Sequence, residues 1–145
     1  MQEHYASSTG MQNTLMSLVF EGVFERFPGL KIVLIEGGFA WAPALCWRMD
    51  KHWERMRKET PHVPRPPSEY VRENCWFTTQ PIEEPENPAH LADIIGWIGW
   101  DRLMFSTDYP HWDFDHPREV FKFPLSDAQK TQVFRDNAKA LYALQ

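Results

Sequence analysis

The pattern of hydrophobic and polar positions predicts helices that alternate with short strands. Apolar residues such as Leu15 and Val19 recur at helical spacing, which predicts an amphipathic helix over 11–27 that ends at Pro28-Gly29. The polar residues before it, 1–10, are expected to be irregular.

Three apolar runs, 31–35, 75–79 and 102–106, have the length and composition of strands. The run at 31–35 lacks polar alternation, which favours a parallel strand buried on both faces. Capping residues and helical spacing predict further helices at 39–58, 68–72 (capped by Ser68), 88–98 (Asn87 cap with Pro88 in the first turn), 126–136 (capping box Ser126–Gln129) and 137–144.

Strands that alternate with helices indicate parallel βαβ units with right-handed crossovers in a single α/β domain over residues 1–145. Three strands are few for a finished parallel sheet, and a closed (β/α)8 barrel needs about 250 residues. The pattern therefore leaves two alternatives, a small open α/β domain or the last part of a barrel.

Composition narrows the function classes. The formal net charge of −5 argues against nucleic acid as a partner. No stretch has the length of a membrane span or the form of a secretory signal, so we expect a cytoplasmic protein with no membrane partner. Cys46 and Cys75 belong to no metal-binding spacing and are expected to be buried free thiols, which suits that compartment.

Polar residues follow each predicted strand, and these residues are the candidates for chemistry. The first strand ends in Glu36-Gly37-Gly38, the second in Thr78-Thr79-Gln80, and the third in Thr107-Asp108, followed by His111. The carboxyl ends of parallel strands lie at one edge, so Glu36, Asp108 and His111 are expected to share a cleft. Trp41 and Trp112 would form its walls.

Each candidate has a structural alternative. Asp108 either ligates a cation, or accepts a proton from metal-bound water, or caps the following turn. Glu36 is either an acid–base group or the partner of an arginine, Arg48 or Arg102. His111 is either a functional donor or acid–base, or a packed side chain.

Two acidic stretches are expected to have no catalytic or metal-binding role. The loop with Glu83, Glu84 and Glu86 is expected to be solvated, and Asp113 and Asp115 are expected to cap turns.

Four stretches together resemble the C-terminal part of the amidohydrolase-related family, metal-dependent TIM-barrel enzymes that include aminocarboxymuconate-semialdehyde decarboxylase. They are Phe27-Pro28-Gly29-Leu30-Lys31-Ile32-Val33-Leu34 with Glu36-Gly37-Gly38 and Trp41, Asn74-Cys75-Trp76-Phe77-Thr78-Thr79-Gln80, Leu103-Met104-Phe105-Ser106-Thr107-Asp108-Tyr109-Pro110-His111, and Asn137-Ala138-Lys139-Ala140-Leu141-Tyr142. The resemblance spans about Met11 to Leu144. It implies that the three strands are barrel strands six to eight and that Asp108 is the metal ligand or proton acceptor at the end of strand eight.

The chain departs from the family pattern in two ways. Glu36 stands where the family often has a histidine, and the family's HxH motif and strand-five histidine do not occur. A catalytic zinc needs about three protein ligands. The chain alone is therefore expected to lack a complete metal site and to be inactive, as a piece of a longer enzyme or of an assembly.

The resemblance implies a parent enzyme that uses a divalent metal, zinc by expectation, to hydrolyse C–N or C–O bonds or to decarboxylate a small carboxylated substrate. Asp108 and Glu36 would be catalytic, with Asp108 also a metal ligand, and His111, Trp41 and Trp112 would contact substrate. The alternative is a catalytically incomplete partial barrel that serves as a structural or oligomerising module, either as a homo-oligomer or paired with the missing N-terminal half.

Overall fold

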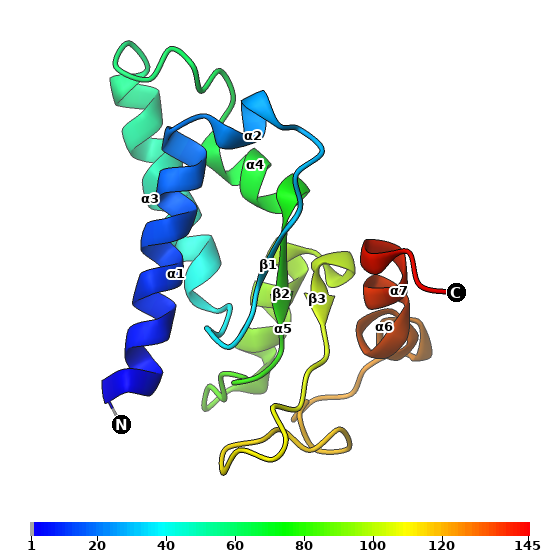
Figure 1. The fold of residues 1–145 in the computed structure, drawn as a ribbon. Helices are drawn as coiled ribbons and strands as arrows, with labels where there is room; N and C mark the ends of the chain where they lie inside the picture. Colours follow the sequence, from blue (N-terminus) through cyan, green and yellow to red (C-terminus); the bar gives the residue numbers. More distant parts are fainter. Residues whose placement is uncertain (1) are drawn as a thin grey trace.

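The computed structural model describes residues 2–145, with side chains described from Ala6 onward. Helices surround a small parallel sheet in which β2 is central (Figure 1). In chain order the elements are α1 (Gln2–Phe20), α2 (Val23–Arg26), β1 (Ile32–Leu34), α3 (Trp41–Met56), α4 (Pro67–Asn74), β2 (Cys75–Thr78), α5 (Pro88–Ile98), the 3-10 turn η1 (Trp100–Arg102), β3 (Leu103–Met104), α6 (Asp127–Thr131), the π-helical turn η2 (Gln132–Asp136) and α7 (Asn137–Tyr142).

The sheet has the strand order β1-β2-β3, and both pairings are parallel. The register aligns Leu34 with Phe77 and Phe77 with Leu103, so these three side chains form a row across the sheet. All three belong to the buried core that the helices cover. The predicted α/β class and the three parallel strands are thus confirmed.

Two predictions at the N-terminal end of the chain are wrong. Residues 2–10 are helical rather than irregular, because α1 begins at Gln2 and continues to Phe20. The predicted helix over 11–27 is divided in two, since Gly22 adopts a φ of 68° between α1 and α2. A left-handed residue interrupts the helical hydrogen-bond ladder at that point.

Two further details also differ from prediction. Ser68 does not cap α4, which starts at Pro67; the Ser68 amide instead donates to Asp50 Oδ1 at 2.9 Å. Strand β1 is only half-buried at Ile32 and Val33, because it forms an edge of the described sheet. The predicted Asn87 cap and the capping box of Ser126 and Gln129 are both confirmed.

Two buried asparagines anchor the N-terminal ends of the outer strands. Asn74 Nδ2 donates to Pro28 O at 3.1 Å and to Leu30 O at 2.8 Å, just before β1. Asn137 Nδ2 donates to Trp100 O at 2.7 Å and to Leu103 O at 2.6 Å, at the start of β3. Each side chain therefore donates to two backbone carbonyls near the start of an outer strand.

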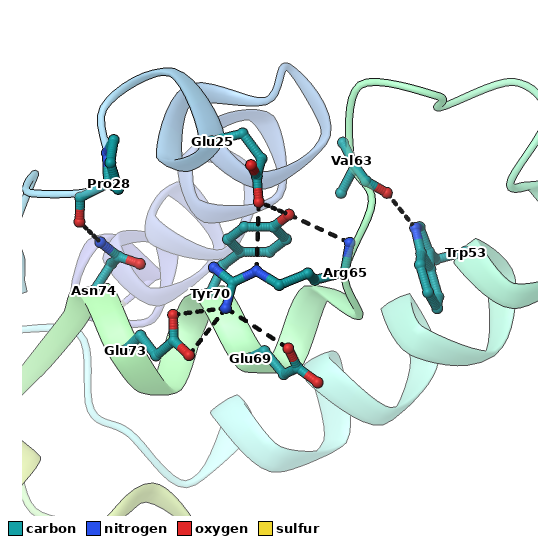
Figure 2. Close-up of polar contacts among 9 residues, drawn as sticks. All are labelled: Glu25, Pro28, Trp53, Val63, Arg65, Glu69, Tyr70, Glu73 and Asn74. Carbon is teal, nitrogen blue, oxygen red and sulfur yellow. Dashed lines mark hydrogen bonds and ion pairs between the residues drawn. The ribbon is translucent and has the colours of Figure 1, made fainter.

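A network around Arg65 lies at the same end of the sheet (Figure 2). Arg65 Nη1 bonds both carboxylate oxygens of Glu73, at 2.9 and 3.0 Å, and its guanidinium lies 4.5 Å from the ring centre of Tyr70. The buried Tyr70 hydroxyl donates to Glu25 Oε1 at 2.5 Å. This network joins α2, α4 and the loop before α4.

Cys46 and Cys75 are buried and free, as predicted. Burial raises the pKa of each thiol to about 12, so neither is a thiolate at neutral pH. Within residues 2–145, no helix is long and apolar enough to cross a membrane.

Candidate active site

The loops that follow the three strands meet at one edge of the sheet, which is the lower edge in Figure 1. The Glu36 amide lies 3.4 Å from Thr78 Oγ1, which joins the loop after β1 to the end of β2. Thr79 Oγ1 accepts from the Ser106 amide at 3.0 Å and donates to Ser106 O at 3.3 Å, which joins the end of β2 to the chain beyond β3. We call this the C-terminal edge.

Asp108 stands at this edge in a left-handed conformation, with a φ of 58°. Its carboxylate is largely buried, with 15% of the side chain exposed, and its Oδ2 lies 2.8 Å from His111 Nδ1. The backbone closes a turn in which the His111 amide donates to Asp108 O at 2.9 Å. The carboxylate thus engages an imidazole three residues on, whereas the structural alternative for Asp108 was a cap of the following turn.

His111 is exposed, and its pKa is raised above the ordinary value of 6.5. The hydrogen bond to Asp108 is the main cause, followed by the charge of Asp108, while the charges of Glu36 and Asp113 add to it. A raised pKa favours the protonated imidazole, which can donate a hydrogen bond or transfer a proton. Glu36 and Asp108 both follow strands at the same edge of the sheet, and a cleft shared with His111 stays a prediction.

Glu36 has a left-handed backbone as well, with a φ of 59°, and is exposed. Ser7 Oγ donates to its carbonyl at 3.0 Å. Of its two predicted arginine partners, Arg102 is paired with Asp101 at 3.5 Å and lies 4.4 Å from the Trp76 ring centre.

The two tryptophans differ in their surroundings. Trp41 is half-buried; its Nε1 donates to Gly37 O at 2.9 Å and its ring meets Phe77 edge-on at 6.1 Å between centroids. Trp112 is 80% exposed on the loop that also carries His111. Substrate contact stays a prediction for both.

Two carboxylates in the loops at this edge, Glu83 after β2 and Asp115 after β3, differ from prediction. Glu83, predicted to be solvated, is largely buried: its Oε1 accepts from the Phe39 and Ala40 amides at 2.9 and 2.8 Å. Asp115, predicted to cap a turn, instead accepts from the Ile82 amide at 3.1 Å. Burial raises the pKa of both carboxyls, although these amide bonds oppose the shift. Both contacts cross between loops far apart in sequence, so no local pattern could indicate them.

The candidate site does not hold a complete set of metal ligands. Among the described residues, no group of three or more His, Cys, Asp or Glu side chains is placed to bind a metal ion. Asp108 offers a hard carboxylate oxygen, but a protein site for a divalent cation needs further ligands. A pocket of about 300 Å³ lies beside this edge, lined by residues that include Glu83, Leu91 and Lys122.

Known proteins are similar to this chain in both sequence and fold. The amidohydrolase family model matches residues 8–144. The γ-resorcylate decarboxylase of Polaromonas sp. strain JS666 is 34% identical over 132 residues, which cover 89% of this chain and 39% of that protein. The chain thus spans about two-fifths of the length of this relative.

Solved structures agree with this result. An amidohydrolase from Mycobacterium avium subsp. paratuberculosis K-10 superposes with a TM-score of 0.77 at 28% identity, over 93% of this chain and 34% of that one. A dihydroxybenzoic acid decarboxylase from Polaromonas sp. JS666, with bound manganese and the inhibitor 2-nitroresorcinol, gives 0.73 at 28% identity, over 94% of this chain and 41% of that one. These neighbours are TIM-barrel enzymes. The chain belongs to the amidohydrolase family.

Proposed function

We propose that this chain forms strands six to eight, with their helices, of the (β/α)8 barrel of a metal-dependent decarboxylase, and that the substrate is a small hydroxylated aromatic carboxylate. The observation that carries the proposal is Asp108, held in a left-handed turn at the C-terminal edge and paired with His111. TIM-barrel enzymes place their chemistry at this edge. The similarity to γ-resorcylate decarboxylases supports the reaction and the substrate class.

Asp108 would contribute one ligand to the metal site. One of its carboxylate oxygens bonds His111, so the other oxygen would meet the cation. Carboxylates suit hard divalent cations, and manganese, which a related decarboxylase binds, is therefore a candidate alongside zinc. Because the described residues do not complete a site, the other ligands would come from strands that these residues do not include.

The residues of this chain can account for the proton that the reaction needs. Decarboxylation breaks the bond between the ring carbon and the carboxylate, releases CO2 and places a proton on that ring carbon. His111 can hold this proton because Asp108 raises its pKa, and Glu36 is a second acid–base group at the same edge. Trp41 and Trp112 would contact the aromatic ring.

A chimera tests the proposal. The aligned C-terminal two-fifths of the Polaromonas γ-resorcylate decarboxylase is replaced by this chain, and CO2 release from γ-resorcylate is measured with added manganese. We expect activity that falls by about a thousandfold in Asp108→Asn, as when a group central to transition-state stabilisation is lost.

Asp101→Asn is the matched control, because Asp101 is an exposed aspartate just before β3, whereas Asp108 follows β3. Its activity should equal that of the unaltered chimera. A folded chimera whose activity is the same with Asn and Asp at position 108 would overturn the role of Asp108. A folded chimera without activity would favour a structural module.

A further inference from the structure

The loop after β2 contacts the loop that carries Glu36. The Glu83 carboxylate reaches the start of α3 across more than forty positions of sequence, and Oε1 accepts from two consecutive amides, those of Phe39 and Ala40. The first amides of a helix have no partner within the helix. Ala40, the N-cap residue of α3, makes no side-chain cap, and Glu83 instead accepts from the Ala40 amide and from the Phe39 amide just before the helix.

We propose that Glu83 is a positioning residue for Glu36. The proposal rests on the proposed function, because it takes Glu36 as the acid–base group after β1. Glu36, Gly37 and Gly38 join the end of β1 to the amides that Glu83 holds. We therefore expect the orientation of Glu36 at the C-terminal edge to depend on the Glu83 carboxylate.

The turn itself needs an external anchor. Glu36 and Gly38 both have left-handed backbones, with φ of 59° and 62°. A non-glycine residue in this region is strained and persists only when its surroundings hold it. Thr78 and Ser7 hold the Glu36 backbone, and Glu83 holds the amides of Phe39 and Ala40 that follow the turn.

Gly38 and Glu83 fit one another closely. A Cβ added to Gly38 would lie 2.5 Å from Glu83 Oε1, so the carboxylate occupies the space that a side chain would need. The second carboxylate oxygen, Oε2, is buried and has no hydrogen-bond partner among the described residues. An unpaired buried oxygen raises the free energy of the folded state. The two hydrogen bonds that Oε1 accepts therefore favour Glu83 at this position.

Nuclear magnetic resonance of the full chain tests this proposal without any metal or substrate. In Glu83→Ala, we expect amide exchange at Phe39 and Ala40 to become about tenfold faster, as when a helix cap is lost. The amide and carboxyl resonances of Glu36 should shift as well. Glu83→Gln keeps an acceptor oxygen of the same reach and should restore both readouts in large part.

Glu84→Ala is the matched control, since Glu84 is an exposed neighbour in the same loop. It should leave the Glu36 resonances unchanged. If Glu83→Ala does not fold, two other variants test the proposal. Gly38→Ala should shift the Glu36 resonances, and Glu83→Gln should leave these resonances close to their positions in the unaltered chain.

The proposal is overturned if Glu83→Ala leaves the Glu36 resonances unchanged, or if Gly38→Ala does so when Glu83→Ala fails to fold. It is also overturned if Glu83→Gln shifts the Glu36 resonances as much as the alanine variant. A second readout applies to the chimera, where Glu83→Ala should lower kcat with little change in KM. An inactive chimera together with the expected resonance shifts would reject the proposed function and leave the positioning role intact.

Discussion

The two ends of the sheet differ in how their polar groups and backbone are arranged. At the N-terminal end, Asn74 and Asn137 each bond two carbonyls, and Arg65 joins Glu25 and Glu73 (Figure 2). At the C-terminal edge, the backbone is left-handed at both Glu36 and Asp108. Side-chain amides hold backbone carbonyls at one end, whereas the other end has left-handed residues that carry acidic side chains.

This difference indicates that the two ends of the strands have different roles. Strained backbone persists where a side chain must be aimed in a particular direction, and the rest of the fold supplies the free energy that holds it. In TIM barrels the N-terminal face contributes stability and the C-terminal face carries the chemistry. We therefore expect substitutions at the N-terminal end to destabilise the fold, whereas substitutions at the C-terminal edge should spare stability and remove function.

The largest expected effect on stability is that of Asn137→Ala. The substitution removes both hydrogen bonds of a buried amide and leaves the carbonyls of Trp100 and Leu103 without that donor. We expect a loss of about 2–3 kcal/mol in the free energy of unfolding, measured with urea. Asn13→Ala, at an exposed position in α1, should change it by less than about 0.5 kcal/mol. Equal effects of the two variants would contradict the anchoring role.

Tyr70→Phe should have a smaller effect, with a characteristic pH dependence. The hydroxyl of the buried Tyr70 donates to Glu25, and its removal should cost about 1–2 kcal/mol at neutral pH. This hydrogen bond is the main reason that the pKa of Glu25 lies below 4.5. Its contribution is present above the unfolded pKa and is lost as the pH falls through the folded pKa.

The acid dependence of unfolding should therefore be shallower in Tyr70→Phe than in the unaltered chain. Urea melts at a series of pH values below neutral would show this. Parallel pH curves for the two proteins would mean that the pair does not couple to stability.

Glu36→Gly tests the C-terminal edge of the sheet, and we expect it to increase stability instead of lowering it. Glycine adopts a φ near 60° without the steric cost that other residues meet. We expect the free energy of unfolding to rise by about 0.5–1 kcal/mol. Glu36→Ala keeps the strained backbone and serves as the matched variant, which should gain nothing. A loss of stability in Glu36→Gly would show that the side chain at position 36 stabilises the fold.

The smallest expected effect concerns His111. Its titration midpoint, followed by the imidazole resonance, should lie above 6.5, and Asp108→Asn should move it toward 6.5. A raised pKa contributes stability that is present below the unfolded pKa and is lost as the pH rises through the folded pKa. A midpoint that is the same in both proteins would mean that Asp108 and His111 do not pair in solution.

Much of the fold was predictable because it depends on local patterns. Apolar runs indicated the three strands, and the caps at Asn87 and Ser126 follow local rules that the structure confirms. The apolar pattern does not predict the start of α1, because its first residues are polar and give no apolar stripe. The cap predicted at Ser68 does not form, because Pro67 already occupies the first turn of α4.

The candidate site was predictable in part. Parallel strands alone bring Glu36, Asp108 and His111 to one edge, so topology was sufficient to group them. The left-handed backbone at Glu36 and Asp108 was not foreseeable, because neither residue type requires it. The contacts of Glu83 and Asp115 depend on loops that meet only after folding, and no spacing in the sequence encodes them.

Manganese-induced line broadening in the amide spectrum of the full chain tests most directly whether the C-terminal edge carries the metal ligand. With only one proposed ligand in the described residues, we expect substoichiometric manganese to bind weakly and to broaden resonances of the C-terminal edge, centred on Asp108 and His111. This broadening should disappear in Asp108→Asn and persist in Asp101→Asn. Broadening centred on the acidic residues at the opposite end, Glu69 and Glu73, or unchanged broadening in Asp108→Asn, would contradict the account.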